Sequence, residues 1–176
     1  MVPYNQLVYV ANFGGDVFAR TKGVRADMWG YQINDISVST LSNAYTKFIN
    51  FILANPEFDN SATWLLEKFG LGVTATIPED STAYAWRQTV AYGFIEYNLP
   101  ENVTEEMTTM VDTFAEKHHA DLVSGCGNPE GNVFPNYARG FEKPEQIYGN
   151  TKLPKLRSLK KKYDPKGLFN FYNSFA

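Results

Sequence analysis

The C-terminal stretch, residues 146–176, constrains the fold of this chain more than any other part. Apolar residues recur at spacings of three and four from Leu153 to Tyr163, which places them on one face of a helix. Basic residues fill most of the other positions, and Pro165 excludes the helical conformation at the residue before it. The pattern predicts an amphipathic helix over residues 153–163 that packs on the rest of the fold.

The bulk composition is that of an ordinary globular protein. Of 176 residues, 44% are hydrophobic and 20% charged, and the net charge of −3 gives no general attraction to nucleic acid or anionic lipid. The single cysteine, Cys126, cannot form a disulfide within the chain, and no run of about 18 apolar residues predicts a membrane span. Residues 1–4 show no signal-peptide pattern, so the localisation stays open.

Two segments have the periodicity of amphipathic helices. Residues 39–54 carry an aromatic and aliphatic stripe, with Ser39 as the expected N-cap. Residues 102–118 form the second predicted helix, in which Asn102 and Glu105 have the spacing of a capping box. His118 and His119 follow near its expected end, where a solvated pair is favoured over a metal site because the chain has no third histidine and no second cysteine.

The remaining patterns indicate strands. Two short strands are expected at residues 7–10 and 17–19, on either side of a glycine turn. Residues 61–68 could be a strand or a helix continuation, and a strand is favoured because Gly70 and Gly72 follow it. Residues 73–77 alternate like a strand, and residues 84–97 are expected to form a long strand or a hairpin. Together the patterns predict an α+β fold: an antiparallel sheet of four or more strands with the two main helices packed on one face, plus the C-terminal helix.

The end of the chain resembles a known family. Tyr148-Gly149, the run from Leu156 to Pro165 and Phe169-x-Phe171 are similar to the ending of the berberine-bridge-enzyme-like flavoprotein oxidoreductases, in the vanillyl-alcohol-oxidase superfamily. Residues 134–137, Phe-Pro-Asn-Tyr, resemble the family's Tyr-x-Asn-Tyr motif, with phenylalanine in place of the first tyrosine. Gly14-Gly15 resembles a degenerate copy of a family segment that approaches FAD.

The resemblance implies a domain organisation. Residues 1–28 would be the tail of the FAD-binding domain, residues 29–145 the substrate-binding domain, and residues 146–176 the C-terminal segment that returns to the FAD domain. The chain carries neither Gly-x-Gly-x-x-Gly nor a P-loop, so the FAD-binding half that holds the pyrophosphate and the attachment residue is expected to be missing.

The resemblance also implies a site. Tyr137 is the candidate catalytic base, while Asn136, Gly14, Gly15 and Tyr148 would contact FAD. Phe134 and Arg87 would contact substrate; no metal ligands are expected. A free tyrosine has a pKa of about 10, so a tyrosine base needs its pKa lowered, and Arg87 on a neighbouring strand is the expected source of positive charge.

Three functions are compatible with these features. The first is part of an FAD-dependent oxidoreductase that oxidises an alcohol, a sugar or a secondary metabolite by hydride transfer, partnered by a separate N-terminal FAD-binding half. The second is a catalytically inactive truncated paralogue, or a small-molecule binding module of the same fold; the chain alone is expected to be inactive. The third, nucleic-acid binding through the basic residues 152–166, is the weakest because the net charge is negative.

Overall fold

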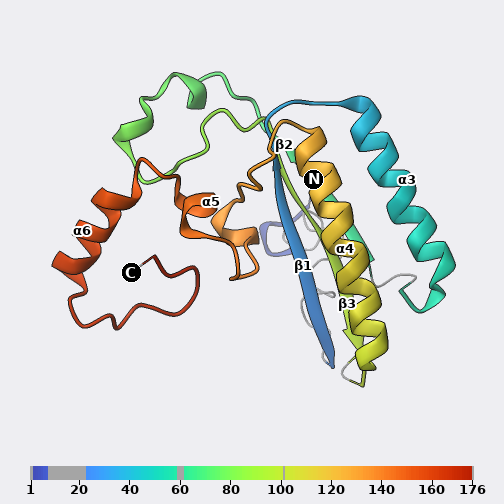
Figure 1. Ribbon diagram of the computed structural model, residues 1–176. Helices are drawn as coiled ribbons and strands as arrows, with labels where there is room; N and C mark the ends of the chain where they lie inside the picture. The colour runs from blue at the N-terminus through green and yellow to red at the C-terminus, as the bar shows by residue number, and fades with distance from the viewer. Residues whose placement is uncertain (1, 8–22, 59–61, 101, 176) are drawn as a thin grey trace.

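The computed structural model describes residues 2–7, 23–58, 62–100 and 102–175 (Figure 1). It is an α+β structure, as the sequence predicts. The strands are β1 (Val24–Ile33), β2 (Ala62–Lys68) and β3 (Ala91–Pro100). The α-helices are α3 (Val38–Ala54), α4 (Glu105–Gly125), α5 (Pro144–Tyr148) and α6 (Leu153–Tyr163). Short 3-10 helices are η1 (Tyr4–Gln6), η2 (Pro56–Phe58), η3 (Thr74–Thr76), η4 (Glu79–Ser81) and η5 (Pro135–Tyr137).

The three strands form one antiparallel sheet in the order β1-β3-β2. In its register Gly30 of β1 and Leu65 of β2 both lie opposite Phe94 of β3. The described part of the chain therefore has three strands, fewer than the four or more predicted. Both predicted N-terminal strands involve residues 8–22, which lie outside the described residues, so they stay predictions.

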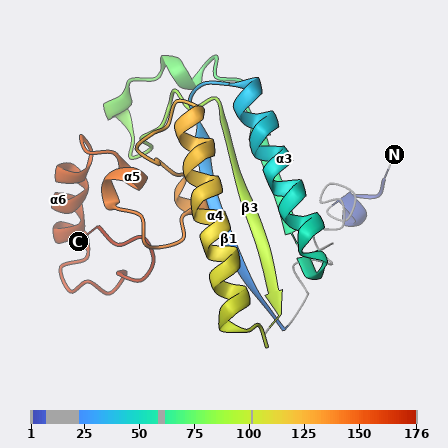
Figure 2. The ribbon, with the colours of Figure 1, turned by 45° about the vertical axis from the view of Figure 1, so that its right-hand side comes forward.

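Helices α3 and α4 lie side by side on one face of the sheet, here called the inner face (Figures 1 and 2). Aromatic rings from both helices and from the strands fill the space between them. The rings of Phe51 and Phe114 stack with centroids 4.0 Å apart, and Phe48 contacts Trp64 edge-on. Burying side chains of this size stabilises the fold by about 1.5–3 kcal/mol each.

The opposite, outer face of the sheet is partly covered by the segment that follows α4. Val133, Ala138 and Ile147 form a small second core there, against which Tyr137 and Tyr148 pack. Helix α6 lies beyond this layer (Figure 1) and has the predicted bounds. Its apolar face is only partly covered, since Leu153 is buried whereas Tyr163 is 73% exposed.

Several predicted boundaries are wrong, for local reasons. The N-cap of α3 is Ser37 rather than Ser39, because the Ser37 hydroxyl accepts a hydrogen bond from the Thr40 amide. Helix α4 begins after Thr104, whose hydroxyl accepts from the Met107 amide, so the capping box at Asn102 does not form. Residues 73–77 contain a 3-10 turn, and of residues 84–97 only 91–97 are strand.

The two adjacent histidines are not the solvated pair that the sequence predicted. Helix α4 runs on to Gly125, so both lie within it. His118 is buried between α3 and α4, where its Nε2 donates to the carbonyl oxygen of Ala44 at 2.8 Å and its Nδ1 has no partner. His119 binds the carbonyl oxygen of Gly30 through Nε2 at 2.8 Å. Burial lowers the pKa of both imidazoles.

These histidines predict that acid destabilises the fold. A depressed folded-state pKa means that the unfolded chain binds the proton first, at its pKa of about 6.5. Their contribution is therefore complete above pH 6.5 and is lost as the pH falls through the folded pKa. Each histidine should add a slope of about 1.4 kcal/mol per pH unit to the free energy of unfolding in that window.

Urea unfolding followed by circular dichroism between pH 7.5 and 5 measures this slope. His118→Phe should remove its share, since phenylalanine can still pack between Phe48 and Phe114. Lys47 and Asp121 also influence His118, so Lys47→Gln is the control for their charges. A slope unchanged in His118→Phe would contradict the assignment.

Within the described residues, no helix has the length and apolarity needed to cross a lipid bilayer.

Candidate functional site

The candidate site is on the outer face of the sheet, where Tyr137 lies against Gly30. A Cβ atom at Gly30 would fall 2.1 Å from the carbonyl oxygen of Tyr137 and 2.5 Å from its Cβ. The backbone of η5 can approach the sheet this closely only because residue 30 has no side chain. Position 30 therefore fixes where the tyrosine lies.

The Tyr137 hydroxyl donates a hydrogen bond to Oε2 of Glu67 on β2, at 2.5 Å. A bond this short is typical of a hydroxyl donating to a carboxylate. Burial and the negative charge of Glu67 together raise the pKa of Tyr137 to about 12. In this structure Tyr137 is thus a proton donor with a raised pKa, whereas the sequence argument required a lowered one.

Aromatic rings frame this pair. Tyr137 meets Phe94 of β3 edge-on, with centroids 5.2 Å apart, and Phe134 in the same way at 5.6 Å. Phe134 in turn packs against Tyr92 at 5.3 Å. Asn136 is exposed beside them. The structure therefore brings Phe134 and Tyr137 into contact, with the exposed Asn136 between them in the chain, and the roles that the motif implied for these residues stay predictions.

Sequence reasoning missed two carboxyl groups on this face. Glu67 was hidden because strand pairing, not sequence proximity, brings it to Tyr137. Glu96 follows Phe94 by two residues on β3 and so points to the same face. It is 6% exposed, and burial raises the pKa of its carboxyl. The sequence did offer one signal for them, since Glu67 and Glu96 are each an acidic residue within a predicted strand that is rich in aromatic residues.

Other predicted site residues lie elsewhere. Arg87 is in the turn before β3 rather than on a strand, and its guanidinium donates to the Thr82 hydroxyl at 2.6 Å. The Tyr148 hydroxyl donates to the carbonyl oxygen of Asn173 at 2.9 Å. Neither side chain contacts Tyr137 within the described part of the chain. Gly14 and Gly15 lie outside the described residues, so the cofactor and substrate contacts of all four stay predictions.

A clamp at the β1 edge holds the segment that carries Tyr137. Two residues after it, Arg139 forms an ion pair with the buried carboxylate of Asp27, which also accepts from Nε1 of Trp29 at 3.1 Å. The Arg139 guanidinium lies 3.8 Å from the Trp29 ring centroid. Burial raises the pKa of Asp27, and the charge of Arg139 opposes that rise.

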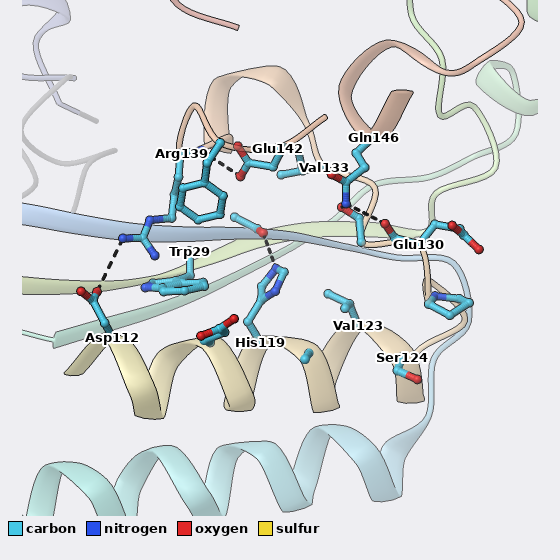
Figure 3. Close-up of a pocket in the computed structure, with 16 residues that line it drawn as sticks. Trp29, Asp112, His119, Val123, Ser124, Glu130, Val133, Arg139, Glu142 and Gln146 are labelled. Atoms are coloured by element: carbon cyan, nitrogen blue, oxygen red, sulfur yellow. Dashed lines mark hydrogen bonds and ion pairs between the residues drawn. The ribbon is translucent and has the colours of Figure 1, made fainter. Parts of the chain in front are cut away.

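Figure 3 shows the cavity beside this clamp, between α4, the β1 edge and residues 129–146. Its volume is about 700 Å³. His119 and Arg139 project into it from opposite walls, and Asp112 lies 3.7 Å from the Arg139 guanidinium. His119, Arg139 and Asp112 each have a partner within the protein. None of these three polar groups is therefore left free to indicate a ligand in this cavity.

Comparison with known proteins gives the same family as the C-terminal motifs. Residues 133–175, which include η5, α5 and α6, match the family model described as berberine and berberine like. The FAD-linked oxidoreductase tazG of Aspergillus terreus is 30% identical over 175 residues. The chain therefore carries a berberine-like segment at its C-terminus and is similar over its whole length to part of an FAD-linked oxidoreductase. A second FAD-linked oxidoreductase, OXR1 of Pyricularia oryzae, is 31% identical over 176 residues.

The chain spans about a third of the length of these relatives. The alignments cover 98% and 97% of the chain but 35% of tazG and 34% of OXR1. The solved structure of Physcomitrella patens BBE-like 1 variant D396N superposes with a TM-score of 0.69, covering 97% of this chain and 36% of that one. At 15% identity this match shows a shared fold.

Proposed function

We propose that this chain forms the substrate-side wall of the active site of an FAD-linked oxidoreductase acting on a small alcohol, sugar or secondary metabolite. The observation that carries the proposal is the hydrogen bond from Tyr137 to Glu67 on a partly covered, aromatic-lined sheet face. Both relatives are FAD-linked oxidoreductases, which supports FAD as the cofactor and oxidation as the reaction. Substrate class and activity are inferred for this chain.

The outer face fits the reacting part of a flavin, though not its phosphates. The rings of Phe94 and Phe134, which both meet Tyr137 edge-on, supply apolar contacts, and the Tyr137–Glu67 pair supplies an acid–base group beside them. The sequence contains no glycine-rich pyrophosphate loop, so FAD would be held mainly by residues outside this chain. Asn136, which is exposed beside Tyr137, would be the nearest polar contact.

Bound FAD would accept a hydride from the substrate carbon. The chain's own task is then to remove the proton of the substrate hydroxyl. Tyr137 would take this proton while passing its own to Oε2 of Glu67, so that no free phenolate has to form. The raised pKa keeps Tyr137 protonated, so the carboxylate of Glu67 has to be the final acceptor of the proton. Glu96, buried further along β3, would set the polarity of the same face.

The direct test is a hybrid protein in which this chain replaces the matching segment of tazG. We expect a yellow hybrid whose flavin absorbance bleaches when an alcohol or sugar substrate is added without oxygen. The 176-residue chain alone should form no stoichiometric yellow complex on titration with FAD. A complex formed by the chain alone, or a folded hybrid that retains no flavin, would contradict the proposed division of the site.

A further inference from the structure

Two buried cations meet at one loop on the α6 side of the molecule, and neither has an acidic partner. Lys152 is 8% exposed and Arg87 is 7% exposed. Lysine and arginine are rarely buried to this degree unless paired, because an isolated charge is costly to remove from water. Among the described residues neither forms an ion pair.

Both cations bind Thr82 and its neighbours through neutral groups alone. The Lys152 ammonium donates to the carbonyl oxygens of Glu79 and of Thr82, the latter at 2.9 Å. Arg87 donates to the Thr82 hydroxyl at 2.6 Å and approaches the Ser81 hydroxyl at 3.5 Å, while its Nε is buried without a partner. An ammonium has three donors, so Lys152 keeps one free.

A cavity of about 650 Å³ opens at this point, within the size range of small-molecule sites. One wall is residues 79–83, and the other is the start of α6, with Lys152 and Lys155 beside Leu156 and Leu159. The first turn of α6 has no acidic residue and no side-chain cap, so its positive dipole end is uncompensated. Glu79 and Asp80 also line the cavity, and both are exposed, so solvent screens their carboxylates more than it screens the buried Lys152.

We propose that this cavity binds an oxyanion, a phosphate or carboxylate group carried on a small apolar body. The anion would accept a hydrogen bond from the free donor of Lys152 and form an ion pair with Lys155. Its negative charge would also offset the positive charge of Arg87, which lies behind Thr82. The apolar body would lie along Leu156 and Leu159. The cavity shares no lining residue with the Tyr137 face, so a test of anion binding here is independent of the flavin proposal.

The test is calorimetric titration of the 176-residue chain with inorganic phosphate and with hexanoate, at constant ionic strength set by sodium chloride. Lys155 is exposed and makes no contact that holds the fold, so Lys155→Glu should weaken binding about tenfold, the loss of one charge-assisted contact. Lys161→Glu is the matched control, because Lys161 is on the same helix but does not line the cavity. It should bind as the parent does.

Amide shifts on binding should map to residues 151–156 in nuclear magnetic resonance spectra. Saturation by phosphate alone would assign a phosphate ester, and saturation by hexanoate alone a carboxylic acid; either supports the site. The proposal is overturned if neither anion binds saturably above chloride, if Lys155→Glu leaves binding unchanged, or if both variants lose it equally.

Discussion

Tyr137→Phe and Glu67→Gln should each lower the turnover of the flavin-loaded tazG hybrid by about 10²–10⁴-fold, the usual contribution of a positioned acid–base group. Phenylalanine keeps the ring that packs on Phe94 but removes the hydroxyl. Glutamine keeps the shape of Glu67 but cannot accept the proton. Because the two residues act as one relay, the double variant should be little worse than either single one.

Stopped-flow reduction of the flavin by saturating substrate measures this step directly. Flavin content should stay the same in both variants, since neither change removes an aromatic contact. Tyr163→Phe, the same substitution at a 73% exposed tyrosine, is the control and should leave the rate unchanged. Additive losses in the double variant, or a rate unaffected by Glu67→Gln, would exclude a shared proton path.

The sequence predicted correctly those elements that depend on local signals alone, and it failed where pairing with a distant segment decides the structure. Helix α6 has the predicted bounds because its leucine spacing and Pro165 are both local signals. Residues 73–77 alternate like a strand, yet they have no neighbouring strand to pair with in the described fold and form a turn. The cap of α4 moved to Thr104 because competing capping residues lie two positions apart, and local sequence alone does not choose between them.

The site was predictable only where one segment holds it. Phe134 and Tyr137 are close in sequence, so their contact follows from the local turn η5 that contains Asn136. Glu67 joins them through the pairing of β2 with β3, which depends on a register that the sequence does not specify. The position of Arg87 likewise depends on where β3 begins. Because β3 begins at Ala91, Arg87 lies in the preceding turn, where it donates to the Thr82 hydroxyl.

Asp27→Ala should lower the free energy of unfolding by about 3–5 kcal/mol, because it removes one partner of a buried ion pair. The Asp27 side chain is 4% exposed and that of Arg139 is 16% exposed, so solvent screens the pair little. The substitution leaves the Trp29 indole without its acceptor and the Arg139 guanidinium with only the more exposed Asp112, 3.7 Å away. It should also loosen the segment that presses Tyr137 onto Gly30.

Urea unfolding followed by circular dichroism measures the loss, and Asp112→Ala supplies the matched control. Asp112 lies 3.7 Å from the same guanidinium, but its side chain is 43% exposed, so its removal should cost at most about 1 kcal/mol. Replacing both partners, Asp27→Leu with Arg139→Met, should recover most of the stability lost in Asp27→Ala, since apolar side chains need no partner. If the two single aspartate variants lose equal stability, the clamp is a surface interaction and Tyr137 is positioned by Gly30 alone.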